Sequence, residues 1–533
     1  MPNRIEEAKL LMDSVALDGA QDNGALQLDS VAEMGDKMKS FNANTGVETI
    51  RKTVLDSVAV YEKHHGTKPS ADLVACALDQ AKIMLDDAVN GTSSAHNPTA
   101  FTPMQPMIAI RAMLASAIPF AHYIQTDKTT GEAPLIIVSH NAGKGTGSYA
   151  EGASLNGLGG GEQYVMPERS HRLNSTDKTT FTGKITPVME GFEQCKQDAT
   201  PHPLYKGRTQ IYINGLRVAT TQRGSDVESA AGLFAFGSER ISFTATVNVN
   251  TGESTVTFAK AVPDNTRVSV RGFLNFETGD RAAITPSVIV SAEKYVMHAS
   301  NYRANVVVTP EAAVQFSREI GVDPAFEGTM AIRQQFGLEQ LYSTLQKLSI
   351  IGQFTQKNTF DFNWKAQGLE KTQAEIAVEL IGLIAKESQI MANRNTSHGI
   401  SHIYVGDTMR AVFLSLGADF FEPSGIAERP GAYRLGRLAG RYEIYYTPKG
   451  IIPEIGEKPL GDRMLLIGAN AANPAFNPVI MGEAAAPNIE SIAPNAQSPD
   501  KGYWVTGKNF NEQNPVNLFA QSVAVIDVLG TAY

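Results

Sequence analysis

Cysteine and excess positive charge are both scarce in this 533-residue sequence, and each scarcity excludes a class of protein. Cysteine occurs only as Cys76 and Cys195, so the chain has no disulfide framework and no cysteine-based zinc site. Lys and Arg number 46 against 55 Asp and Glu, which gives a net charge of −9. A surface that wraps nucleic acid needs clustered cations, and this balance argues against one.

Long apolar runs are also missing. No stretch reaches the roughly 18 consecutive apolar residues that a membrane-spanning helix needs, and the first residues lack the apolar core of a secretory signal. We therefore expect a soluble protein made in a reducing cytoplasm, with no membrane partner. Hydrophobic residues make up 42% and charged residues 19% of the chain, a globular composition, and the length allows two to four domains.

One glycine-rich stretch, "HNAGKGTGSYAEGASLNGLGGGEQY" at 140–164, looks at first like a phosphate-binding loop. That loop needs G-x-x-x-x-G-K followed by Ser or Thr. Here Gly145 follows Gly143 and Lys144, and Val138 stands where the first glycine belongs. The dinucleotide motif G-x-G-x-x-G fails as well, so we expect no cofactor. The composition instead predicts a long flexible excursion.

Two other pairs of residues could suggest chemistry. His398 and His402 have the spacing of helical zinc ligands, but the sequence around them predicts a loop entering a strand, and the glutamate of the helical zinc motif is missing. Cys195 and His202 could be drawn as a thiol–imidazole pair, but no third group is placed to orient them. We therefore expect no metal site, no catalytic residues and no enzymatic activity.

Hydrophobic periodicity divides the rest of the chain. Residues 3–90 read as amphipathic helices, and 205–276 read as alternating strands of a small antiparallel sandwich separated by turn residues. Residues 177–190 read as a strand returning from the glycine-rich excursion. A break at Gly321–Pro324 begins a long helix to about residue 350. Its apolar positions include Phe326, Met330, Phe336, Leu341 and Leu345.

A set of residues around this helix carries a family resemblance. Ten of them occur in a characteristic order: Thr309, Glu311, Ala312, Gln315, Phe316, Arg318, Gly321, Val322, Asp323 and Glu327. This order, between Lys294 and Leu348, resembles the central region of the major capsid proteins of large myoviruses. The segments "AIPFAHYIQTDKTTGEAPLIIVS", "RLGRLAGRYEIYYTPKG" and "FAQSVAVIDVLGTAY" are similar to that family in order and texture. The resemblance covers about 105–190 and 285–533.

The resemblance implies an α+β chain with the Hong Kong 97-type capsid fold of tailed phages, built from an N-terminal arm, an extended β-hairpin loop, a peripheral domain with a long spine helix, and an axial domain. The implied division is a helical N-terminal region at 1–104, the start of the peripheral domain at 105–129, the extended loop and its return strand at 130–199, an inserted antiparallel β-sandwich at 200–285, the peripheral domain with the spine helix at 286–365, the axial domain at 366–440, and strands returning through both domains at 441–533.

The implied function is self-assembly, as hexamers and pentamers, into the icosahedral head shell that encloses phage DNA without sequence-specific binding. Location in the virion after assembly in the host cytoplasm follows, with portal, scaffolding and decoration proteins as candidate partners. The N-terminal helical region resembles a segment that proteases remove in some members, and we expect its retention here. The alternatives are another phage structural protein, such as a tail sheath or decoration protein, and a nucleotide-using enzyme.

In this interpretation, 140–164 is the tip of the extended loop. We expect residues 143–161 to contact a neighbouring subunit and no nucleotide, and to project from the body of their own subunit with few internal contacts. The contact residues expected at the tip are Gly143, Lys144, Gly145, Gly147, Gly157, Gly159, Gly160 and Gly161. Lys144 also raises the alternative of a covalent cross-link to a neighbour, although its flanking glycines and the lack of an identifiable catalytic glutamate disfavour it.

Overall fold

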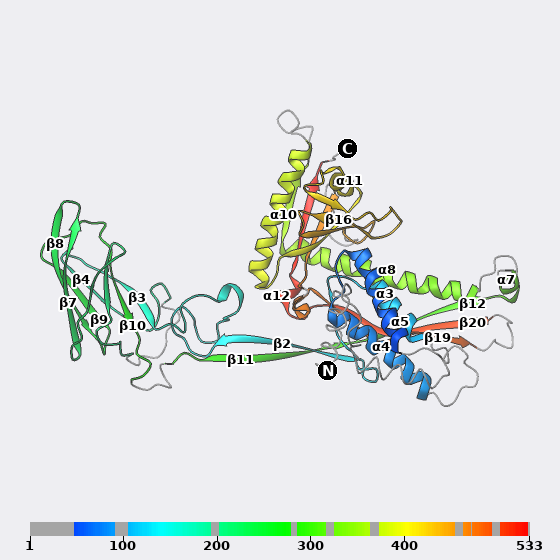
Figure 1. Ribbon diagram of the computed structural model, residues 1–533, viewed down its shortest axis with the longest axis horizontal. Coiled ribbons are helices and arrows are strands. Elements are labelled where there is room, and N and C mark those ends of the chain that lie inside the picture. Colours follow the sequence, from blue (N-terminus) through cyan, green and yellow to red (C-terminus); the bar gives the residue numbers. More distant parts are fainter. Residues whose placement is uncertain are drawn as a thin grey trace. The chain divides into compact units, whose positions relative to one another are not determined.

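Two compact units make up the computed structural model, and the chain passes between them inside two strands. Unit 1 comprises Met1–Ile136 and Lys294–Tyr533, and unit 2 comprises Ile137–Glu293. Strands β2 (Glu132–Ala142) and β11 (Val288–His298) each contain one of the two crossings, and they pair as a two-stranded sheet (Figure 1). The structure describes residues 47–90, 105–192, 202–278, 285–315, 324–362, 373–452, 462–470, 472–492 and 501–530.

Unit 1 begins with helices that bury one apolar stripe each. They are α3 (Val47–His65), α4 (Ala71–Asn90) and α5 (Gln105–Ser116). In α3, Ile50, Val54, Val58 and Tyr61 recur at helical spacing and are all buried, as the amphipathic pattern predicts. Among the described residues, no helix is both long enough and apolar enough to cross a membrane.

A seven-stranded sheet follows, with buried residues on both faces. Its order is β13-β21-β18-β14-β17-β16-β15. The strands are β13 (Lys357–Asp361), β14 (Ile400–Val405), β15 (Phe421–Pro423), β16 (Tyr433–Leu438), β17 (Tyr442–Tyr446), β18 (Asp462–Gly468) and β21 (Val523–Leu529). The runs "MLLIG" in β18 and "VAVI" in β21 are continuously apolar because neither face of these strands meets water. Helices α10 (Gln373–Asn395) and α11 (Asp407–Ser415) contribute to the core on one face.

The second sheet of unit 1 has the order β1-β19-β20-β12. Its strands are β1 (Ala121–Tyr123), β12 (Ser300–Val308), β19 (Val479–Ile492) and β20 (Lys501–Gln513). The short helices α7 (Pro310–Gln315) and α12 (Asn517–Ala520) and the 3₁₀ turn η4 (Pro474–Phe476) complete the unit.

Helix α8 (Pro324–Thr355) lies where the sequence predicts a long helix from the Gly321–Pro324 break to about residue 350, and its 32 residues begin at a proline suited to the first turn. The Phe336 ring stacks on Tyr302 of β12 at 4.2 Å. Leu345 is fully buried and Leu341 partly buried in the unit 1 core. The side chains of Phe326 and Met330 lie outside the described residues.

Unit 2 contains a sandwich of two four-stranded sheets around one core. The first has the order β3-β10-β5-β6 and the second β4-β9-β8-β7. The strands are β3 (Glu168–Leu173), β4 (Thr180–Lys184), β5 (Gln210–Ile213), β6 (Leu216–Thr220), β7 (Val227–Phe236), β8 (Glu239–Asn248), β9 (Glu253–Phe258) and β10 (Val268–Phe273). Inward residues alternate with exposed ones, as in β8, where Ile241, Phe243, Ala245 and Val247 are buried, so the strand pattern expected over 205–276 is confirmed.

The prediction that the strand within 177–190 returns alongside the strand before the glycine-rich stretch is wrong. Residues 177–190 contain β4, but β4 pairs with β9 inside the sandwich, and the partner of β2 is β11. The sandwich therefore also includes β3 and β4, which lie before the residue 200 expected as its start. An alternating strand can bury its apolar face equally well in a hairpin or in a sandwich, so its local pattern does not select its partner.

Candidate functional site

The paired strands β2 and β11, here called the β2/β11 ribbon, expose an unusual amount of apolar surface. Its outward apolar residues are 41% to 63% exposed. They are Ile136, Val138, Val288, Ile289, Val290 and Val296. Among the described residues, no further strand joins this sheet. A two-stranded sheet alone is marginally stable in water, and contiguous exposed apolar residues commonly mark a surface that a partner covers.

A side-chain contact joins the two strands of the ribbon. The hydroxyls of Ser139 and Ser291 lie 2.7 Å apart and form one hydrogen bond across it. Six exposed positions of the ribbon carry Val or Ile side chains, which favour extended backbone, and its other exposed positions include Glu132, His140, Glu293 and Lys294. The ribbon is therefore the candidate functional site of the chain, because it exposes six Val and Ile side chains that a partner surface could cover.

The glycine-rich stretch lies next to this ribbon in unit 2. The amide of Gly143 donates to the carbonyl of Ser287 at 2.7 Å, and the hydroxyl of Tyr164 donates to the same carbonyl at 2.7 Å. Gly147 has φ 63°, a conformation that favours glycine. Its amide donates to the carbonyl of Pro187 at 3.0 Å. The stretch is thus bonded at both ends to residues distant in the sequence.

The expectation that this stretch makes few contacts within its own subunit is wrong. Tyr149 and Tyr164 are buried, and their ring centroids lie 5.4 Å apart in an edge-to-face arrangement. The two rings form a small cluster with the fully buried Ala142. Two aromatic side chains provide a small core that offsets part of the ordering cost of the glycines. These two tyrosines are the signal in the sequence that could have predicted an ordered stretch.

The predicted contact residues therefore fall into two groups. Gly145 and Gly147 are buried inside unit 2, and Gly143 and Lys144 are half-buried. Gly157 and Gly161 are exposed, and Gly159 and Gly160 are half-buried around the 3₁₀ turn η1 (Gly157–Gly159). The contact of these residues with a neighbouring subunit stays a prediction, and the exposed positions at 157 and 161 are the ones available for it.

Arg169 of β3 is hydrogen-bonded to the glycine-rich stretch and to the residues that follow it, and no sequence motif marks it. Its side chain is fully buried. The guanidinium donates to the carbonyls of Pro187 at 2.5 Å, Met166 at 2.6 Å and Glu168 at 2.8 Å, and to the Thr146 hydroxyl at 3.4 Å. Burial lowers the pKa of this guanidinium to about 10. The buried cation is thus held by backbone carbonyls of residues that follow the stretch and by one hydroxyl within it.

The two residue pairs that the sequence offered as candidates for chemistry do not form a site in the described residues. His402 is buried on β14 with its Nδ1 2.8 Å from the Ser401 hydroxyl, and burial lowers its pKa to about 4. His398 precedes the strand, and burial lowers its pKa to about 4 as well. The structure describes no group of three or more His, Cys, Asp or Glu side chains that could hold a metal ion. His202 is buried, and Cys195 lies outside the described residues.

Comparison with known proteins gives similarity to solved structures alone. No family model matches the sequence, and no curated protein does. The capsid of the jumbo bacteriophage PhiKZ is similar with a TM-score of 0.40 and 7% identity, over 77% of this chain and 92% of that one. The capsid of the Myoviridae phage XM1 is similar with a TM-score of 0.28 and 9% identity, over 60% and 86% of the two chains. The encapsulin SrpI of Synechococcus elongatus has a TM-score of 0.26 and 13% identity, over 45% and 77%.

Proposed function

We propose that this chain is the major capsid protein of a tailed bacteriophage, and that its copies assemble into the icosahedral head shell that encloses the DNA. The observation that carries the proposal is the β2/β11 ribbon, which exposes six β-branched side chains although the sheets of units 1 and 2 are well packed. A second copy of the chain is the proposed occupant of this surface.

A ribbon without a partner leaves its apolar side chains in water and loses the free energy of burying them. Full burial of a Val or Ile side chain contributes about 1.5–3 kcal/mol, and six such side chains are 41% to 63% exposed here. Identical subunits that close a shell give every ribbon an equivalent neighbour, so the same surface is covered on each copy. A monomeric protein would gain nothing from keeping this surface exposed.

The finer assignments belong to the same proposal. Helix α8 with the four-stranded sheet corresponds to the peripheral domain and its spine helix. The seven-stranded sheet with α10 and α11 corresponds to the axial domain, which also takes β18 and β21 from the C-terminal part of the chain. The β2/β11 ribbon is the extended loop, and the sandwich is an insertion in the chain between its two strands. Subunits would form hexamers and pentamers, and the chain would act structurally and not as an enzyme.

The partners in this proposal are other copies of the chain and the packaged DNA, with portal, scaffolding and decoration proteins as candidates. The net charge of −9 suits a container whose DNA must move during packaging, because like charges oppose tight adsorption.

Electron microscopy of the purified protein tests the proposal. Closed shells with hexameric and pentameric capsomers are the expected result. Tubes with helical symmetry would instead indicate a tail sheath. A small discrete oligomer that never forms shells, at any protein or salt concentration tried, would overturn the proposal.

A further inference from the structure

The seven-stranded sheet of unit 1 buries two different cores, one on each face. Alternate residues of its strands point in opposite directions. Ile403, Leu466 and Ile526 belong to the core that includes α10 and α11. Tyr404, Leu465 and Val525 belong to the core that includes α3, α4, α5 and the C-terminal half of α8. The N-terminal helices therefore share a core with β14, β17, β18 and β21 on one face of this sheet.

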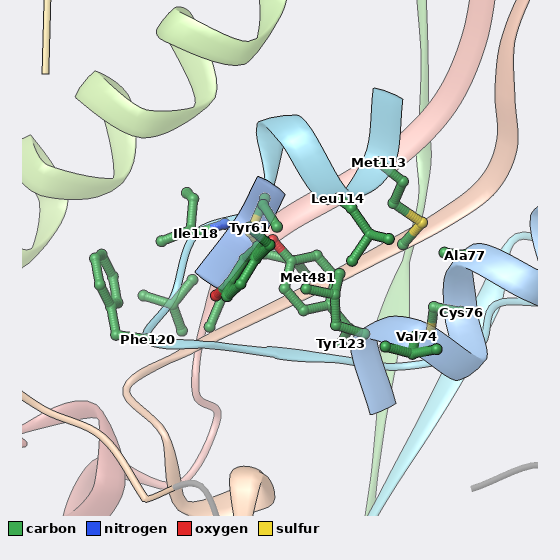
Figure 2. Close-up of a cluster of buried hydrophobic side chains, with 14 of the residues drawn as sticks. Tyr61, Val74, Cys76, Ala77, Met113, Leu114, Ile118, Phe120, Tyr123 and Met481 are labelled. Carbon is green, nitrogen blue, oxygen red and sulfur yellow. Dashed lines mark hydrogen bonds between the residues drawn. The ribbon is translucent and has the colours of Figure 1, made fainter. Parts of the chain in front are cut away.

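Helices α3 and α4 are buried as deeply as the strands that they cover. In α3, Ile50, Val54 and Val58 are each 1% exposed. The α4 residues of the same core are Leu73, Val74, Ala75, Cys76, Ala77, Leu78 and Ala81. Figure 2 shows Tyr61 of α3 together with residues of α4, with Leu114 and Met113 of α5 and with Met481 of β19. Removal of both helices would expose the apolar residues of the sheets and of α5 that pack in the same core.

Polar contacts join α4 to the four-stranded sheet. The buried carboxylate of Asp72 lies 2.7 Å from Nδ1 of His122 and accepts a hydrogen bond from the amide of Tyr123 at 2.9 Å, both on β1. The bond and charge of His122 oppose the effect of burial and lower the pKa of Asp72. Further along the helix, the side-chain amide of Gln80 donates to the carbonyl of Glu483 on β19. Loss of α4 would leave these buried groups without these partners.

The C-terminal end of α3 is held by the seven-stranded sheet. The hydroxyl of Tyr445 donates to the carbonyl of His65 at 3.2 Å, and the guanidinium of Arg437 donates to the carbonyl of Gly66 at 3.3 Å. The last carbonyls of a helix have no partner inside it, and a cation there also complements the helix dipole. Both helices are thus fixed to strands from the C-terminal half of the chain.

From these contacts we infer that α3 and α4 are permanent parts of the folded subunit, so that proteolytic trimming of the N-terminus, where it occurs, stops before Val47. The inference rests on the proposed function only for its setting in an assembled particle. The two contact networks and the shared core lie within a single subunit and do not depend on assembly. A protease that cut between α4 and α5 would leave a fragment that stays bound to the rest of the chain.

Two measurements on the full-length chain test this inference. The first is the intact mass of the subunit in assembled particles. A mature N-terminus at or before Val47 is expected, and one after Val47 would overturn the inference. The second uses unassembled subunits with a site-specific protease sequence inserted within 91–104, so that its result does not depend on shell formation.

After cleavage of that insert, the fragment that contains α3 and α4 should co-elute with the remainder in native size exclusion and separate only in denaturant. Release of the fragment under native conditions would contradict the inference. The double variant Tyr61→Ala and Asp72→Ala should increase release at least tenfold, whereas the exposed control Glu62→Ala should not change it. Equal release from both variants would show that the buried contacts do not hold the helices.

Discussion

Arg463 of β18 and Asp527 of β21 form a buried ion pair between neighbouring strands, with Nε–Oδ1 2.7 Å and Nη2–Oδ2 3.2 Å. Both side chains are almost completely buried. The same Arg463 donates to Oε1 of Gln353 on α8 at 3.3 Å, and Nζ of Lys357 on β13 lies 3.2 Å from Asp527. One charged pair therefore joins the end of the long helix to three strands of the sheet.

Replacement Asp527→Asn is expected to destabilise unit 1 strongly, because it leaves the Arg463 cation buried with no carboxylate on the neighbouring strand. Breaking one partner of a buried pair costs about 3–5 kcal/mol, and urea unfolding followed by circular dichroism measures it. The exposed pair of Lys260 and Glu239, 2.8 Å apart, is the matched control. Lys260→Ala should leave the unfolding midpoint unchanged, and an equal loss in both variants would refute the role of burial.

Replacement Arg169→Met is expected to loosen the glycine-rich stretch while the sandwich stays folded. The variant removes the hydrogen bonds of the guanidinium to three backbone carbonyls, and a hydrogen bond to a charged group contributes about 1.5–3 kcal/mol. Hydrogen exchange should quicken at the amides of Gly147 and Met189. Arg172→Met, at an exposed position of the same strand, should not alter exchange there. Unchanged protection in Arg169→Met would show that the tyrosine core alone orders the stretch.

The double variant Ile289→Asp and Val290→Asp is expected to block shell assembly and leave the subunit folded. Charges on the ribbon must be desolvated when a second copy packs on it, whereas in the free subunit they stay in water. Sedimentation velocity and electron microscopy measure assembly, and the melting temperature measures folding. Leu233→Asp changes an equally exposed apolar residue of the sandwich, 68% exposed, and should assemble normally. Shells formed by the ribbon variant would remove the main support for the proposed function.

The buried carboxyl of Glu483 on β19 is expected to make the stability of unit 1 depend on pH. Burial raises the pKa of this carboxyl to about 7, although Arg333 of α8 acts in the opposite direction. The unfolded carboxyl loses its proton near pH 4.5 and the folded one near pH 7, so this contribution is complete below pH 4.5 and is lost as pH rises to about 7. Its size is on the order of 3 kcal/mol.

Glu483→Gln should remove this part of the pH dependence and should therefore be relatively more stable than the parent protein at pH 8 than at pH 5. Urea unfolding at the two pH values checks it. Glu253→Gln, at an exposed position of β9, serves as the control and should preserve the slope. If the difference in free energy of unfolding between the parent protein and Glu483→Gln is the same at both pH values, the buried carboxyl does not have a raised pKa.

Several elements followed from local sequence patterns because those patterns report directly on burial. The 3.6-residue spacing of Ile50, Val54, Val58 and Tyr61 predicted the buried stripe of α3, and alternation predicted β8 and its neighbours in the sandwich. The proline and glycine break before α8 predicted where that helix begins.

Partner choice and exposure were decided by the tertiary structure. The strand "APLIIVS" is apolar whether it is buried or not, and only its pairing with β11 shows that Ile136 and Val138 face outward on a two-stranded ribbon. The glycine-rich stretch became ordered through Tyr149, Tyr164 and Arg169, whose contacts join residues far apart in the chain. Local periodicity reports which face of an element is apolar, but the free energy that selects its partner comes from packing between distant segments.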